Sequence, residues 1–141
     1  NLNKFYMLFI TRKEHFSASH ILRNPNLNNE ENADLFGKCS NLHGHNYYLE
    51  VTVKGTPDAK TGYVIDLKVM KSIINECIID KVDHRFLNEL DIFNNIIPTT
   101  ENIAVVFWNL LADKLKGDNY SLHTVKIFET EKNCVVYDGK S

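Results

Sequence analysis

The sequence predicts an α+β fold in which a four-stranded antiparallel sheet carries two helices on one of its faces. Two strand-like segments come first, two helix-like segments follow, and two strand-like segments end the chain. Strands joined by a short turn, as the last two are, favour antiparallel pairing. We therefore expect the order strand, strand, helix, helix, strand, strand.

The first half of the chain contains two segments with strand character. Residues 7–20 are rich in β-branched and aromatic side chains, which favour a long strand. A polar loop, rich in Asn and acidic residues and interrupted by Pro25, is expected over residues 21–42. Residues 47–54 alternate apolar with polar side chains, which is typical of a half-buried strand, and a turn is expected over residues 55–62.

Two helices are expected in the middle of the chain. The first begins after Asp66, whose carboxylate can cap it, and runs to about Asp80. The second begins near Thr99 or Thr100, just beyond Pro98. Each carries an apolar stripe that the sheet can bury. The stripes consist of Leu67, Met70, Ile74, Cys77 and Ile78 in the first helix, and of Ile103, Ala104, Phe107, Trp108, Leu111 and Leu115 in the second.

The last two strands are expected at residues 122–130 and 134–137, joined as a hairpin by residues 131–133. Burial is expected for Cys134 in the final strand. A sheet of four strands leaves two open edges, and long edges are usually paired or protected. We therefore expect a homo-oligomer in which strand addition between subunits closes the sheets into a larger barrel.

Composition limits the class of partner. The chain has 141 residues, 43% of them hydrophobic, and is expected to form one domain over residues 7–141. Lys and Arg number 16 against 18 Asp and Glu, so the net charge of −2 predicts a small-molecule partner, with neither nucleic acid nor a membrane surface. Three cysteines without paired spacing argue against disulfides and for the cytoplasm, a reducing compartment.

Residues 1–6 precede Met7, which lies where the first strand pattern begins. We expect Met7 to be a natural start. Residues 1–6 would then be the remnant of an expression tag or an unprocessed extension.

The segment His43-Gly44-His45 is the most informative part of the chain. In an extended backbone, residues two apart point to one face, and Gly44 lets the chain pass close to an ion. His20, at the end of the first strand, would complete a set of three imidazoles. Three histidines with one open position are typical of a catalytic zinc site. A histidine pair at this spacing is by itself more often coincidental, so the prediction depends on the third.

Seven motifs carry a family resemblance. They are residues 16–20 (Phe-Ser-Ala-Ser-His), 36–39 (Phe-Gly-Lys-Cys), 43–47 (His-Gly-His-Asn-Tyr), 62–66 (Gly-Tyr-Val-Ile-Asp), Asp83-His84, 98–102 (Pro-Thr-Thr-Glu-Asn) and Glu129-Thr130. Together, and in this order, they resemble the 6-pyruvoyltetrahydropterin synthase and 6-carboxytetrahydropterin synthase family. The resemblance covers nearly the whole chain from Met7 onward.

The resemblance implies the tunnelling fold, in which subunits of four strands and two helices join into barrels, commonly as trimers stacked into hexamers. It implies zinc bound by His20, His43 and His45, and it implies 7,8-dihydroneopterin triphosphate as the substrate. It also implies that active sites are assembled where subunits meet, in agreement with the open sheet edges.

Cys39 lies close in sequence to the histidine pair and next to Lys38, which would favour its thiolate near neutral pH. We therefore expect Cys39 to act as the general base. Cys39 could instead be a fourth zinc ligand, because a cysteine four residues before a histidine pair is also compatible with a closed structural site.

Further roles follow from the same resemblance. Asp83 and His84 match a proton-relay pair, often contributed by a neighbouring subunit. Glu129 matches the residue that anchors the pterin, since a carboxylate can accept two hydrogen bonds from the guanidine-like edge of the ring. Without the resemblance, Asp83 and His84 would be interpreted as a surface ion pair and Glu129 as an ordinary strand carboxylate. The pterin pocket would also include Thr99, Thr100 and Glu101.

Two products are compatible with this family. Cys39 lies four residues before His43, a spacing typical of 6-carboxytetrahydropterin synthases, whereas residues 29–32, 36–39 and 99–102 resemble the 6-pyruvoyl branch. The spacing determines how far the Cys39 thiol lies from the zinc, so we give it more weight than the motifs that resemble the 6-pyruvoyl branch. We expect a zinc-dependent lyase that forms 6-carboxy-5,6,7,8-tetrahydropterin for the queuosine route and releases acetaldehyde and triphosphate. The alternative is a 6-pyruvoyltetrahydropterin synthase of the tetrahydrobiopterin route, and an alternative of another class is a non-catalytic zinc- or pterin-binding module.

Overall fold

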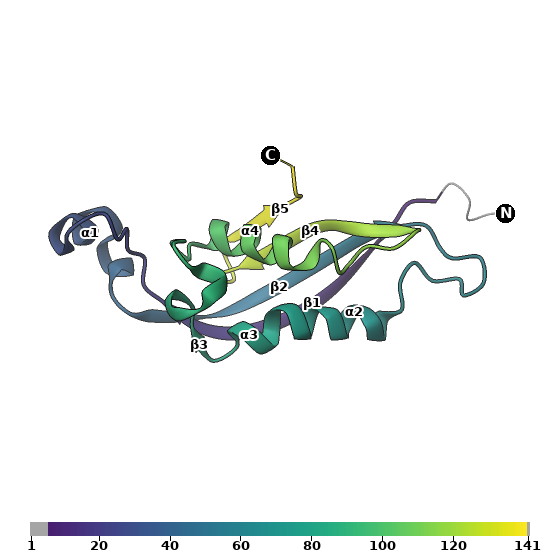
Figure 1. Ribbon diagram of the computed structural model, residues 1–141, viewed down its shortest axis with the longest axis horizontal. Coiled ribbons are helices and arrows are strands. Elements are labelled where there is room, and N and C mark those ends of the chain that lie inside the picture. The colour runs from purple at the N-terminus through teal and green to yellow at the C-terminus, as the bar shows by residue number, and fades with distance from the viewer. Residues whose placement is uncertain (1–5, 141) are drawn as a thin grey trace.

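A computed structural model describes residues 6–140 of the chain (Figure 1). Five strands form one mixed sheet in the spatial order β3-β1-β2-β4-β5, with helices packed against it, which confirms the α+β class. The strands are β1 (Leu8–His20), β2 (His43–Gly55), β3 (Arg85–Phe86), β4 (Tyr120–Phe128) and β5 (Cys134–Tyr137). Four of them, β1, β2, β4 and β5, pair antiparallel as expected.

The fifth strand, β3, was not expected, so the four-stranded antiparallel sheet is a correction. Strand β3 runs parallel to β1, with Ala18 opposite Arg85. The chain reaches this edge because the carboxylate of Asp83, after the first long helix, accepts a hydrogen bond from the backbone N–H of Ser17 at 3.0 Å. A strand of two residues is too short to show a periodic pattern in the sequence.

The ladder between β1 and β2 positions the histidines. Its antiparallel register ends with His20 opposite His43. Strand β2 begins at His43 rather than at the expected residue 47, so the whole motif of residues 43–45 lies inside the strand. Alternate β2 residues from Tyr47 to Val53 are buried, and by the same alternation the side chains of His43 and His45 share their face.

Two helical segments cover this face. The first is continuous through α2 (Leu67–Ile74), a π-helical turn (Asn75–Ile79) and α3 (Asp80–Val82). The expected cap is confirmed, because the Asp66 carboxylate accepts from the Lys68 backbone N–H at 2.8 Å. The second is α4 (Thr100–Leu111).

Both helices pack into one core with the buried faces of β1, β2 and β4. The largest fully buried side chains include Phe16 of β1, Tyr47 of β2 and Phe107 of α4. The strand side chains that alternate with the buried ones point to the opposite face of the sheet. There Phe9 and Tyr48 are exposed, so this second face is not covered by the rest of the described chain.

The loop expected before β2 contains α1 (Asn29–Phe36) and a 3-10 turn (Gly37–Ser40), which lie at one end of the molecule (Figure 1). Asn28 and Glu31 form a capping box, each side chain accepting from the other residue's backbone N–H. The helix is polar and buries only Asn32, so no apolar period marks it in the sequence. The capping box was the available signal.

Two further 3-10 turns, Leu87–Glu89 and Asp91–Phe93, connect β3 to α4. Within the described residues, no helix has the length and apolar character needed to cross a membrane. The expectation for residues 1–6 lies outside the described residues, apart from Tyr6, which is exposed.

Candidate metal centre and substrate pocket

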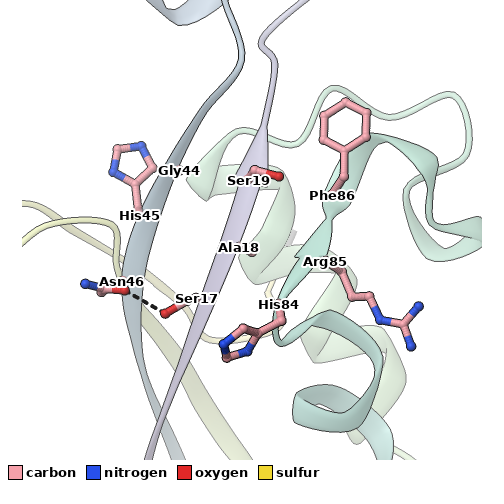
Figure 2. A pocket seen from close by; sticks show the side chains of 9 residues that line it. All are labelled: Ser17, Ala18, Ser19, Gly44, His45, Asn46, His84, Arg85 and Phe86. Carbon is pink, nitrogen blue, oxygen red and sulfur yellow. Dashed lines mark hydrogen bonds between the residues drawn. The ribbon is translucent and has the colours of Figure 1, made fainter.

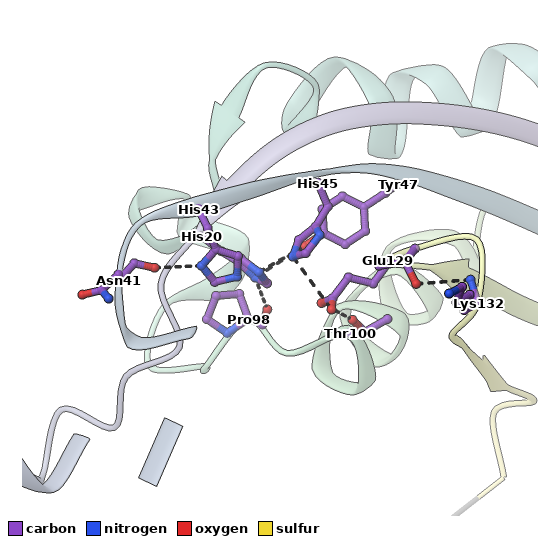
Figure 3. Close-up of polar contacts among 10 residues, drawn as sticks. His20, Asn41, His43, His45, Tyr47, Pro98, Thr100, Glu129 and Lys132 are labelled. Atoms are coloured by element: carbon purple, nitrogen blue, oxygen red, sulfur yellow. Dashed lines mark hydrogen bonds and ion pairs between the residues drawn. The ribbon is translucent and has the colours of Figure 1, made fainter. Parts of the chain in front are cut away.

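Three histidine side chains meet on the helix-covered face of the sheet (Figure 3). His20 comes from the end of β1, and His43 and His45 come from the beginning of β2. Their ring centroids lie 4.5 Å (His20 to His43), 5.3 Å (His20 to His45) and 5.1 Å (His43 to His45) apart. One nitrogen of each ring lies within 4.8 Å of the others, so the cluster can hold a metal ion.

Backbone carbonyls orient two of the rings. His20 Nδ1 lies 2.9 Å from the carbonyl oxygen of Pro98, and His43 Nδ1 lies 2.7 Å from that of Asn41. Because a carbonyl oxygen can only accept, each Nδ1 carries the proton and each Nε2 is left with a free lone pair. This arrangement of outer partners is typical of metal-ligating histidines.

The third ring carries an unpartnered nitrogen. His45 Nε2 is buried, and no hydrogen-bond partner for it exists among the described residues. The Glu129 carboxylate does not supply a partner, because its Oε1 is 3.8 Å away, which is too long for a hydrogen bond. A buried polar atom without a partner calls for an explanation, and a metal ion bound between the three imidazoles would supply the missing contact.

Burial keeps His20 in the neutral state that can bind a metal. His20 is fully buried, and this desolvation lowers the pKa of its imidazole, so the ring is neutral near pH 7. The hydroxyl of Tyr47 lies 3.4 Å from His20 Nδ1. Burial, reinforced by the charge of Glu129, raises the pKa of Tyr47, so its phenol stays protonated.

Glu129 connects the cluster to a neighbouring hollow. It follows β4 directly, and its Oε2 accepts a hydrogen bond from Thr100 Oγ1 at 2.8 Å, while its Oε1 faces His45. The hollow has a volume of about 220 Å³. Its lining consists of Thr100, Glu101, Glu129, Asn133, Cys134 and Val135.

Three of the four expected pocket residues therefore meet in this hollow. The fourth, Thr99, does not line it, because its hydroxyl accepts from the Asn102 backbone N–H at 3.2 Å and caps α4. Asn133 and Cys134 were not expected to line it, and Cys134, expected to be buried, is exposed. The signal that could have placed them was the hairpin turn, which returns the chain beside Glu129.

Cys39 lies in the 3-10 turn before β2, and its thiol is exposed. Its carbonyl oxygen accepts from the Leu22 backbone N–H at 2.9 Å, which holds the turn against the chain that leaves β1. In the described part of the chain the candidate metal group consists of His20, His43 and His45, and Cys39 is not a member.

Asp83 and His84 form the expected pair, but away from the cluster. Asp83 Oδ1 lies 3.0 Å from His84 Nδ1 and accepts the Ser17 N–H, and that backbone hydrogen bond is the first cause that lowers the pKa of Asp83. The backbone of His84 is left-handed at φ 60°, and its side chain is 82% exposed. Ser17 and Asn46, beside which His84 lies in Figure 2, alternate with the cluster histidines along their strands and so belong to the opposite face.

Comparison with known proteins gives one consistent result. The sequence profile of a family described as 6-pyruvoyl tetrahydropterin synthase matches residues 9–140. A 6-pyruvoyl tetrahydrobiopterin synthase of Dictyostelium discoideum is 42% identical over 134 residues, covering 94% of this chain and 97% of the relative. A 6-carboxy-5,6,7,8-tetrahydropterin synthase of Rickettsia typhi is 31% identical over 150 residues, covering 92% and 99%.

A solved structure agrees with the sequence comparison. The 6-pyruvoyl tetrahydropterin synthase of Caenorhabditis elegans superimposes with a TM-score of 0.88 at 34% identity, covering 96% of this chain and 97% of that chain. The residues that the family profile matches, 9–140, include all three histidines and Glu129. The chain belongs to the 6-pyruvoyl tetrahydropterin synthase family.

Proposed function

We propose that this enzyme converts 7,8-dihydroneopterin triphosphate to 6-pyruvoyl tetrahydropterin, with release of triphosphate, and that it depends on zinc. The observation that carries the proposal is the 3.8 Å separation between His45 Nε2 and Glu129 Oε1. A pterin ring anchored on Glu129 would extend its side chain toward the three histidines.

The relatives support the 6-pyruvoyl product over the 6-carboxy product that the spacing of Cys39 and His43 favoured. A relative named for the 6-pyruvoyl product is 42% identical to this chain, whereas a relative named for the 6-carboxy product is 31% identical. The short spacing in this chain is the one feature that favours the 6-carboxy product. That product is therefore the second candidate.

The metal would be held by the Nε2 atoms of His20 and His43 and by the ring of His45. Three neutral imidazoles suit zinc and leave one coordination position for a substrate oxygen. When bound, zinc supplies a Lewis acid that polarises that oxygen. The two backbone carbonyls of Pro98 and Asn41 hold the imidazoles in the orientation that this needs.

The pterin ring would lie in the hollow beside Glu129. Its carboxylate can accept hydrogen bonds from the ring's N–H groups, and such charge-assisted bonds are strong and directional. Thr100 fixes one carboxylate oxygen through its 2.8 Å hydrogen bond, so the carboxylate cannot rotate freely. Glu101 lines the same hollow and would shape its mouth.

Proton transfers would use Cys39 as general base and the Asp83–His84 pair as a relay. Because Asp83 and His84 lie on the opposite face of the sheet from the cluster, they would serve the metal centre of a second copy. Strand addition can bring the copies together. In the described chain, residues 8–16 of β1 pair with β2 alone and β5 pairs with β4 alone, so each leaves an open sheet edge. We propose a homo-oligomer, a trimer or a dimer of trimers.

The chain has three free cysteines, which suit a reducing compartment such as the cytoplasm.

Mass spectrometry of the products from 7,8-dihydroneopterin triphosphate tests the proposal with zinc-loaded protein. We expect 6-pyruvoyl tetrahydropterin and inorganic triphosphate. A 6-carboxytetrahydropterin product with acetaldehyde would instead show that the Cys39 spacing decides the outcome. No conversion by protein with full zinc content would favour a binding module, in which Cys39→Ala should also strip the metal.

A further inference from the structure

A second and larger hollow lies on the uncovered face of the sheet, where β1, β2 and β3 meet (Figure 2). Its volume is about 590 Å³. The residues that give it chemical character are Ser17, Ser19, Gly44, Asn46, His84 and Arg85. His45 also borders it, although its ring lies on the helix-covered face with the other histidines of the cluster. The hollow has no lining residue in common with the hollow beside Glu129.

Hydrogen-bond donors line this hollow without partners of their own. Ser17 Oγ donates to Asn46 Oδ1 at 2.6 Å, which turns the Asn46 amide so that its NH₂ group is left to donate. Within residues 6–140, neither that NH₂ group nor the Ser19 hydroxyl makes a side-chain hydrogen bond. The hollow therefore presents donors on both β1 and β2.

Arg85 is the cation that lines the hollow. Arg85 forms no ion pair with the described residues, and no carboxylate lines the hollow. The nearby carboxylate of Asp83 is occupied by the Ser17 N–H and by His84 Nδ1. A neutral or cationic ligand would leave the guanidinium unpaired, whereas phosphate oxygens match its fork of N–H donors.

The backbone keeps the hollow open. Gly44 forms part of its wall, and a Cβ there would approach the carbonyl oxygen of Ala18 to 3.0 Å. A side chain at this position would crowd β1 and reduce the space. In Figure 2 the Asn46 and Ser17 side chains lie on one side of His84, and Arg85 extends on the other side, with its guanidinium directed away from Asn46 and Ser17.

We propose that this hollow binds a phosphate-bearing anion, with Arg85 as the principal cation and Asn46 and Ser19 as neutral donors. The anion site stands on these contacts alone. Its assignment to the triphosphate of a substrate bound mainly by a neighbouring copy rests on the proposed function, because His84 would act there. The other source with the same chemistry is free inorganic phosphate or polyphosphate.

Calorimetric titration of the zinc-loaded protein with inorganic triphosphate tests the site directly. Arg85→Gln should weaken binding by at least about tenfold, because a charged hydrogen-bonding group is lost, and Arg85→Lys should retain part of the affinity. Ser19→Ala should cause a smaller loss. Lys60→Gln, which removes the same charge from the exposed turn before Gly62, is the matched control and should bind as the unmodified protein does.

Equal affinities of Arg85→Gln and the unmodified protein, or no binding by the unmodified protein, would overturn the site. Steady-state inhibition then separates the two sources. Competition by inorganic triphosphate against the pterin substrate, together with a raised KM and little change in kcat in Arg85→Gln, would assign the site to the substrate's own triphosphate. Calorimetric binding without competition would assign it to free phosphate. Calorimetry remains informative even if no 6-pyruvoyl product forms, so the two proposals can fail separately.

Discussion

Both faces of the sheet carry chemically reactive groups near the His20 end of β1 and the His43 end of β2. The faces differ in whether one chain supplies partners for these groups. On the helix-covered face, one chain supplies three histidines, and backbone carbonyls orient two of them. On the uncovered face, His84 is 82% exposed and Arg85 has no ion-pair partner in the described chain. Under the proposed function, metal binding would be a property of one chain, whereas proton transfer would need a second copy.

Removal of a histidine from the covered face should have the largest effect. His43→Ala leaves two imidazoles, so zinc content and turnover should fall by more than the roughly 10–100-fold that follows loss of an outer partner of a metal ligand. Elemental analysis and product formation measure both. His123→Ala, outside the cluster, is the control and should keep its zinc. One zinc per chain and normal turnover in His43→Ala would contradict the assignment.

Mixing two inactive variants tests the claim that the uncovered face serves another copy. Cys39→Ala and His84→Ala should each lower turnover by about 10²–10⁴-fold, the usual contribution of a general acid or base, and both should retain zinc. Co-expression of the two should restore part of the activity, because some sites then combine an intact Cys39 with an intact His84. If mixed oligomers form and remain inactive, both residues act within one chain.

Changes at Glu129 should affect the substrate more than the metal. Glu129→Gln removes a charged acceptor and should raise KM by roughly 10–100-fold, while the zinc content stays unchanged. Thr100→Val should have a smaller effect, because it only frees the Glu129 carboxylate to rotate. Glu131→Gln, in the exposed hairpin turn, is the matched control. A loss of zinc in Glu129→Gln would mean that this carboxylate is itself a ligand.

The smallest effect is expected for Asp83, on the uncovered face, and concerns how the free energy of unfolding changes in acid. The Ser17 N–H, and then His84, lower the pKa of Asp83 below its ordinary value of 3.8. The carboxylate therefore stabilises the folded chain above pH 3.8, and this contribution is lost as pH falls toward its folded pKa. Urea unfolding from pH 6 to pH 3 should show Asp83→Asn less stable near pH 6, with the difference shrinking in acid. A constant difference would contradict this role.

Much of the fold could be predicted from periodic patterns. The alternation in β2, the apolar stripes of α2 and α4, and the caps at Asp66 and Thr99 each have a local cause that the sequence displays. Strand β3 could not be predicted, because two residues show no period and their pairing with β1 is accompanied by a contact distant in sequence, between Asp83 and the Ser17 N–H. Helix α1 lacks an apolar stripe, and its stability depends on a cap and on one buried Asn.

Some residues of the candidate site could also be predicted from local patterns, and others could not. The histidine cluster could be predicted because strand spacing places residues 43 and 45 on one face, and a hairpin-like neighbour can present His20. The positions of Asn133 and Cys134 in the hollow beside Glu129 follow from the hairpin turn, which pairs β5 with β4, although the alternation of the strands does not show which side chains line it. The separation of Asp83 and His84 from the cluster depends on the chain's path around the sheet edge.

Whether the three histidines hold the metal to which a pterin binds can be seen in diffraction data collected at the zinc absorption edge, from crystals grown with zinc and a pterin product. We expect an anomalous peak among His20, His43 and His45, with a pterin oxygen completing the coordination and the ring hydrogen-bonded to Glu129. A peak whose fourth ligand is the thiol of Cys39, or a pterin bound away from Glu129, would contradict it.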